Sequence, residues 1–161
     1  MFVKPANMGS SVGVSRATNA DEVAAAIGLA ATYDREVILE EEVIGREIEI
    51  AVLGNEDPEA SVAGEIVPGA DFYDYADKYD DGADLLIPAP LTGDELAELQ
   101  SLAIGAYRVC KVEGLARVDL FFEDGSRNTA RSRGWLINEI NTMPGFTPIS
   151  MYPKMWQASG L

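Results

Sequence analysis

Residues 138–147 read Asn-Glu-Ile-Asn-Thr-Met-Pro-Gly-Phe-Thr, and they follow the apolar residues Trp135, Leu136 and Ile137. The stretch 135–141 predicts a β-strand, in which alternate side chains point to the same face. Glu139 and Asn141 are therefore expected on one face of this strand, and strict alternation would put Ile137 on that face as well.

A second strand is predicted at 115–122, where Arg117 and Asp119 alternate with apolar residues. If the two strands pair as a hairpin, Asp119 meets Glu139 and Asn141, with Arg117 beside them. Oxygen ligands without nitrogen or sulfur suit a hard cation such as Mg²⁺. The alternative is a charged, solvent-facing side of the sheet, but the apolar character of both strands favours a metal site.

The rest of the chain predicts a mixture of short strands and helices, which favours an α+β domain. The remaining strands are expected at 2–4, 36–43, 47–53 and 60–67, and the helices at 21–32 and from 92 to about 111. The alternation in 47–53 indicates a half-buried strand with Glu47 and Glu49 on its polar side. Residues 69–84 are expected to form a long loop. Cys110 falls on the apolar stripe of the second helix, where core packing is expected.

Composition excludes several classes of function. The 161 residues carry 27 acidic and 12 basic side chains, a formal charge of −15, so nucleic-acid binding is not expected. The chain has no histidine, which excludes a Ser–His–Asp triad or an imidazole-ligated zinc site within it. The sequence shows no signal segment and no apolar run of membrane-spanning length, so we expect a cytoplasmic protein without a membrane partner.

Lys4 precedes the run Gly9-Ser10-Ser11-Val12-Gly13. Small residues let backbone N–H groups approach a phosphate, two hydroxyls add donors, and the lysine adds positive charge. An ordinary glycine turn is an equal alternative. The run also matches the nucleophile elbow of serine hydrolases, but that interpretation needs a histidine base, which the chain lacks.

Two further segments have polar side chains that suit a nucleotide. The run Glu40-Glu41-Glu42-Val43, with Glu47 behind it, offers acceptors for an adenine amino group and ribose hydroxyls, although its spacing alone favours a solvated edge. Lys78 and Tyr79 lie in an aromatic loop that suits a mobile lid over a reaction centre. An ordinary surface loop is the alternative there.

Taken in order, the runs 4–13, 72–79, 116–119 and 138–147 resemble the D-alanine–D-alanine ligases, members of the ATP-grasp fold. The resemblance covers nearly the whole chain, and its last run is the most specific. It implies an incomplete ATP-grasp fold. Residues 1–46 would be part of the central subdomain, with the phosphate loop and adenine hinge. Residues 47–161 would be most of the C-terminal subdomain, with the lid loop, metal site and second-substrate loop.

The resemblance also implies roles for individual residues. The ATP-binding residues would be Lys4, Ser10, Ser11, Glu40, Glu42, Val43, Glu47 and Lys78. The ligands of Mg²⁺, which Mn²⁺ could replace, would be Asp119, Glu139 and Asn141. The catalytic residues would be Ser10, Tyr79 and Arg117, and the substrate-binding residues would be Gly145, Ser150 and Met151.

The implied reaction joins two D-alanines for peptidoglycan precursors. One carboxylate takes the γ-phosphate of ATP to give an acyl phosphate, and the amine of the second D-alanine displaces it. The N-terminal part of such ligases would lie before Met1, so the isolated chain is expected to be inactive; a full-length enzyme could be a homodimer. The alternatives are a truncated, non-catalytic nucleotide-binding fragment and another ATP-grasp carboxylate–amine ligase.

Overall fold

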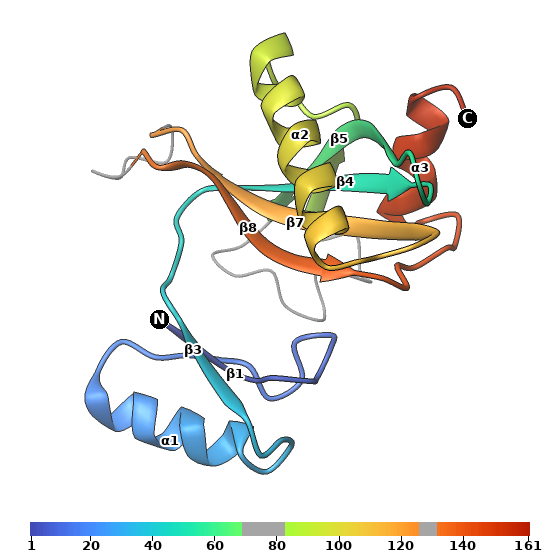
Figure 1. Ribbon diagram of the computed structural model, residues 1–161. Helices are drawn as coiled ribbons and strands as arrows, with labels where there is room; N and C mark the ends of the chain where they lie inside the picture. Colours follow the sequence, from blue (N-terminus) through green and yellow to red (C-terminus); the bar gives the residue numbers. More distant parts are fainter. Residues whose placement is uncertain (69–82, 126–131) are drawn as a thin grey trace. The chain divides into compact units, whose positions relative to one another are not determined.

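The computed structural model describes residues 1–68, 83–125 and 132–161, which form two compact units (Figure 1). Among these residues, the first unit contains 1–43 and the second contains those from 44 onward. Most of the loop predicted at 69–84 lies outside the described residues. Its last residues form a strand, β6 (Ala83–Leu86), so the loop prediction was wrong at that end.

The first unit is a small antiparallel sheet with one helix. Its strand order is β2-β1-β3, with β1 (Phe2–Pro5) between β2 (Ser15–Arg16) and β3 (Val37–Glu40). The helix α1 (Ala20–Ala30) packs on β1, and its buried alanines form a small core with Val3. The strand predicted at 36–43 is therefore real but shorter than expected.

The helix α1 begins where the capping residues predict. The side chain of Asn19 accepts a hydrogen bond from the backbone N–H of Glu22 at 3.0 Å. The Glu22 carboxylate reaches one residue further back than in a standard capping box and accepts from the backbone N–H of Thr18 at 2.7 Å. These two bonds fix the first turn of the helix.

The second unit is built on one antiparallel sheet in the order β6-β5-β4-β7-β8. The strand β4 lies at its centre, between β5 and β7, so it has neighbours on both edges. The bounds of the four longer strands are β4 (Arg46–Leu53), β5 (Glu59–Pro68), β7 (Leu115–Glu123) and β8 (Gly134–Asn141).

One face of this sheet packs against the helix α2 (Gly93–Val109), which crosses it in Figure 1. The helix begins with the predicted capping box between Thr92 and Glu95. Its buried residues Leu99, Ala103 and Tyr107 belong to the same core as the buried apolar side chains of β4 and β7. This cluster is the main core of the described chain.

The opposite face of β4 is covered as well, by the helix α3 (Met151–Ala158). Gly64 on β5 lies opposite Glu49 in the sheet, and a Cβ added to it would clash with Met151 and come within 3.4 Å of the Met155 sulfur. Glu49 and Ala51 are consequently buried. The prediction of a half-buried strand with a solvated polar side was therefore wrong, because α3 packs on that side.

The prediction that Cys110 packs in the core was also wrong. Cys110 is exposed, and it is the C-cap residue that follows the last helical residue, Val109. The apolar stripe of α2 ends at Tyr107, whose hydroxyl donates to the carbonyl of Gly54 at 2.7 Å.

No helix in the described part of the chain is long and apolar enough to cross a lipid bilayer.

The contact between Gly64 and α3 gives a test of the packing. Gly64→Val should lower the free energy of unfolding by about 1–3 kcal/mol, because the added methyl groups must displace the buried ends of Met151 and Met155. Urea denaturation measures this change. The control is Gly105→Ala in α2, where an added Cβ meets nothing within 4 Å and helix propensity should increase stability. A Gly64→Val variant as stable as the parent would contradict this packing.

Candidate active site

Three acidic side chains form a row across neighbouring strands of the second unit. Glu49 on β4 lies opposite Asp119 on β7, and Asp119 lies opposite Glu139 on β8. In the next row of the same face, Arg117 lies opposite Asn141 on β8 and opposite Ala51 on β4. Residues directly opposite in antiparallel strands share a face, so the polar side chains gather in one place.

Arg117 is the cation at the centre of this group. Its Nε and Nη2 atoms donate to the two carboxylate oxygens of Asp119, both at 2.6 Å. Its Nε atom also lies 3.1 Å from Oε2 of Glu49, which makes a second ion pair. Two carboxylates on adjacent strands thus contact one guanidinium, and the planar fork of arginine suits such a pairing.

Asn141 connects the two carboxylates of the hairpin. Its side-chain nitrogen donates to Asp119 at 2.8 Å and to Glu139 at 3.3 Å. The convergence of Asp119, Glu139 and Asn141 expected from strand alternation is thus found.

Burial sets the electrostatics of this group. Desolvation raises the pKa of the Asp119 carboxyl above its usual value, and the hydrogen bonds and charge of Arg117 oppose that shift. For Arg117 itself, burial disfavours the charged form, but the hydrogen bonds that it donates to Asp119 and the charges of Asp119 and Glu49 outweigh this effect, so its pKa is raised. Arg117 is therefore permanently charged, and Asp119 is in an environment that favours added positive charge.

The side chains of Asp119, Glu139 and Asn141 fit a hard cation as metal ligands. Among the described residues no three His, Cys, Asp or Glu side chains gather as a metal site, so the fit depends on the amide of Asn141 as the third donor. An amide turned over about its last bond presents its oxygen in place of its nitrogen. Asp119, Glu139 and Asn141 then offer oxygens only, as Mg²⁺ and Mn²⁺ prefer.

One detail of the predicted site was wrong. Ile137 does not share the face of Glu139, because the register of β7 and β8 shifts between Asp119 and Leu120 and pairs Ile137 with Leu120. Leu120 belongs to the core under α2, so Ile137 lies on that side of the sheet. The shift leaves Asn138 as the extra residue.

Glu49 is the site residue that sequence reasoning missed. Its alternation with apolar residues suggested a solvated side of the strand, whereas it is 7% exposed and paired with Arg117. The pairing of β4 with β7 would have identified it, since that register places Glu49 opposite Asp119.

In the first unit, the predicted phosphate lysine contacts a predicted adenine-binding residue. Lys4 Nζ lies 2.7 Å from Oε1 of Glu40 on the neighbouring strand β3. Ser10 and Ser11 both have positive φ angles, 54° and 59°, a conformation that costs non-glycine residues energy and often occurs at functional loops. Gly13 has φ 74°, and a Cβ there would clash with Tyr33 and Pro5.

The other nucleotide-binding predictions concern an acidic run and a loop. Glu42 forms an ion pair with Arg16 at 2.7 Å. Val43 and Glu47 are half-buried, at the end of the first unit and on β4 of the second. Lys78 and Tyr79 lie outside the described residues.

The predicted substrate-binding residues lie around the start of α3. Ser150 is its N-cap residue, and the Ser150 hydroxyl accepts from the backbone N–H of Thr147 at 3.1 Å instead of capping the helix. A Cβ at Gly145 would come within 2.8 Å of that hydroxyl, so a larger residue there would displace it. The Met151 side chain is buried against Gly64, which leaves only its backbone for a ligand.

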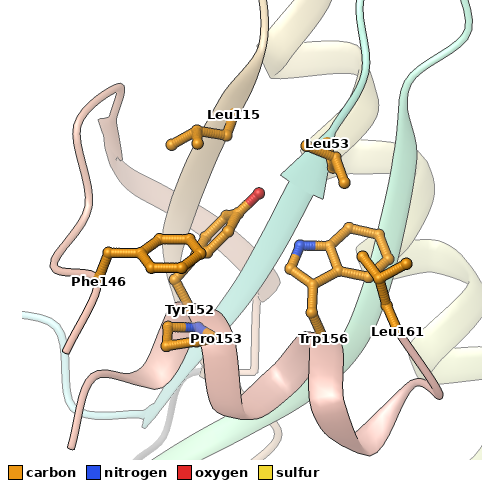
Figure 2. Close-up of a pocket in the computed structure, with 7 residues that line it drawn as sticks. All are labelled: Leu53, Leu115, Phe146, Tyr152, Pro153, Trp156 and Leu161. Carbon is orange, nitrogen blue, oxygen red and sulfur yellow. The ribbon is translucent and has the colours of Figure 1, made fainter. Parts of the chain in front are cut away.

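An apolar pocket of about 310 Å³ lies beside this turn (Figure 2). The rings of Phe146, Tyr152 and Trp156 line it together with Leu53, Leu115, Pro153 and Leu161. Figure 2 shows the Tyr152 hydroxyl directed toward the strands, where it donates to the carbonyl of Val52 at 3.0 Å. With no charged side chain in its lining, this pocket is unsuited to phosphates or a cation.

Comparison with known proteins identifies the family. The model of the family described as "D-ala D-ala ligase C-terminus" matches residues 1–161. The D-alanine–D-alanine ligase of Thermoanaerobacter sp. is 53% identical over 161 residues, which cover 99% of this chain and 43% of the relative. The ligase of Solibacter usitatus is 53% identical over 162 residues, 100% of this chain and 48% of the relative.

Solved structures agree in fold. The D-alanine–D-alanine ligase of Coxiella burnetii matches 99% of this chain and 40% of its own with a TM-score of 0.82 and 40% identity. The VanG D-Ala:D-Ser ligase of Enterococcus faecalis matches 99% of this chain and 45% of its own with a TM-score of 0.84 and 35% identity. The predicted α+β, partial ATP-grasp fold is thereby confirmed.

The chain spans less than half the length of these relatives. Its sequence over that span and its fold agree with the family resemblance predicted from the sequence. This chain belongs to the D-alanine–D-alanine ligase family and corresponds to its C-terminal part.

Proposed function

We propose that this chain is the C-terminal part of an ATP-dependent ligase that joins two D-alanines into D-alanyl-D-alanine. The observation that carries the proposal is the convergence of Asp119, Glu139 and Asn141 beside Arg117, in a chain that is 53% identical to D-alanine–D-alanine ligases over its length. The reaction consumes ATP, so we assign the protein to the cytoplasm, where peptidoglycan precursors are made.

The polar side chains gathered on β7 and β8 would have separate roles, some toward the metal and one toward the substrate. Asp119, Glu139 and Asn141 would hold Mg²⁺, which would neutralise charge on the phosphates of ATP during transfer. Arg117 would orient the reacting carboxylate and stabilise the negative charge that develops when the amine attacks the acyl phosphate. Phosphate then leaves, the amide bond forms, and the amine loses its proton.

The first unit would contact ATP. Lys4 and the Ser10-Ser11 turn would bind phosphates, since backbone N–H groups and a lysine Nζ are ordinary phosphate donors. Glu40, Glu42 and Val43 would receive the adenine, and Glu47 of the second unit the ribose. Lys78 and Tyr79 would complete a lid, and Gly145, Ser150 and the backbone of Met151 would bind the second amino acid.

One solved relative is named as a D-Ala:D-Ser ligase, so the acceptor amino acid needs its own test. D-alanine is the proposed acceptor because the curated relatives with the higher identities are D-alanine–D-alanine ligases. A non-catalytic nucleotide-binding fragment is the alternative outcome, and a homodimer is proposed only for the full-length enzyme.

The metal site can be tested on the chain itself. Asp119→Asn should weaken Mn²⁺ binding by about tenfold or more, because it removes a charged ligand. Electron paramagnetic resonance of free Mn²⁺ during a titration measures the affinity. The matched control is Asp57→Asn, whose side chain is 99% exposed, and it should bind as the parent does. Equal affinities for the parent and Asp119→Asn would refute the site.

We expect the activity to require a part of the ligase outside the span that this chain matches in its relatives. Alone, the 161 residues should release no phosphate from ATP with Mg²⁺ and D-alanine, because the substrates are not held in attack geometry. Joined to the N-terminal part of the Thermoanaerobacter ligase, they should form D-alanyl-D-alanine in preference to D-alanyl-D-serine. Chromatography of the products measures how much of each dipeptide is formed.

Turnover by the isolated chain would contradict the first expectation. A folded, ATP-binding chimera that forms no dipeptide would instead favour the non-catalytic alternative. Preference for D-serine would retain the ligase function but correct the acceptor.

A further inference from the structure

Glu49 lies next to the proposed catalytic arginine but has no role in the function proposed above. It comes from the central strand β4, opposite Asp119, and its carboxylate oxygen lies 3.1 Å from Nε of Arg117. It is one of the few buried charged side chains of the described chain. Burying a carboxylate is costly unless a partner compensates its charge, and Arg117 is such a partner of Glu49.

Asp119 has two roles that compete for the same atoms. Arg117 occupies both of its oxygens at 2.6 Å, and Asn141 donates to one of them at 2.8 Å. A divalent cation bound to Asp119 would draw the negative charge of those oxygens to itself, which weakens their hold on the guanidinium. Arg117 would then need another anion to keep it at the reaction centre.

We propose that Glu49 is the positioning residue of Arg117 in the metal-bound state. When a divalent cation binds Asp119, the Nε–H of Arg117 passes to Oε2 of Glu49, and the guanidinium stays in place for the substrate. This inference rests on the proposed function, because it takes Asp119 as a metal ligand and Arg117 as a substrate contact.

The surroundings of Glu49 suit this task better than metal binding. No three acidic side chains of the described residues gather as a metal cluster, so Glu49 is not a third carboxylate ligand. Ala51 lies directly beside Arg117 in the sheet and is fully buried. Its side chain is too small to compete with Glu49 for contact with the guanidinium. The helix α3 covers this side of β4, so Glu49 cannot swing out to solvent without opening that packing.

The Nε–H resonance of Arg117 reports the exchange of partners directly. It is assigned by its loss in Arg117→Lys and followed by ¹H–¹⁵N spectroscopy as MgCl₂ is added to the chain, with NaCl as the ionic-strength control. In the parent, Mg²⁺ should shift this resonance while its hydrogen exchange stays slow. In Glu49→Gln, Mg²⁺ should speed that exchange by about tenfold, the loss expected for one charged hydrogen bond.

The control is Glu65→Gln on the other face of the same sheet. Glu65 is likewise buried, and its carboxylate accepts from Nε and Nη2 of Arg46 at 3.0 Å and 2.7 Å, so it matches Glu49 in burial and pairing but lies away from the acidic row. It should leave the Arg117 exchange rate as in the parent. Thermal melts of both variants check that the sheet is folded.

Three outcomes would overturn the inference, and they can be told apart. Equal Mg²⁺ responses in the parent and Glu49→Gln would remove the role of Glu49 and leave the metal site standing. The same acceleration in Glu65→Gln would show general loosening of the sheet. Absence of any Mg²⁺ response at Asp119, Glu139 and Asn141 would overturn the metal site, and this inference with it.

Discussion

The antiparallel register of β4, β7 and β8 is the constraint on which the site depends. It sets Glu49, Asp119 and Glu139 in one row and puts Arg117 beside them. A slip by one residue would turn every side chain of a strand to the other face. The core under α2 prevents this slip, because residues such as Ile50 and Val118 would leave the core and the acids would enter it. Core packing thus determines the geometry of the polar face.

The free-energy cost of burying acidic side chains in this sheet is offset by arginines that pair with them. Arg117 pairs with Glu49 and Asp119, and the same arrangement recurs elsewhere in the second unit, where Arg46 pairs with Glu65 and Arg133 with Glu123. A buried carboxylate left without its arginine would cost several kcal/mol, of the order of 3–5. The formal charge of −15 therefore does not accumulate inside the sheet. Of these pairs, only the one at Arg117 lies beside Asn141 and Glu139, where we propose that a divalent cation binds.

How far the sequence predicts this structure differs between local and long-range features. Alternation and capping patterns are local, so they predicted the strands of the hairpin, the start of α2 and the convergence of Asp119, Glu139 and Asn141. The burial of Glu49 depends on α3, which lies about a hundred residues away in the chain, so no local pattern reveals it. The register shift at Ile137 is likewise a property of two strands together, and one strand's alternation cannot predict it.

In each unit a basic side chain pairs with a carboxylate of the same sheet, but separating the two pairs costs very different amounts of free energy. Lys4 and Glu40 are both partly exposed, and such an ion pair contributes about 0–1 kcal/mol, so the phosphate that we propose for this site would displace Glu40 at little cost. Arg117 and Asp119 are largely buried, and separating them without a replacement would leave an uncompensated charge in the sheet. The lysine of the more exposed pair can therefore change partners at little cost, whereas the arginine paired with a buried carboxylate needs a second carboxylate within reach. We propose that Glu49, at 3.1 Å, is that carboxylate for Arg117.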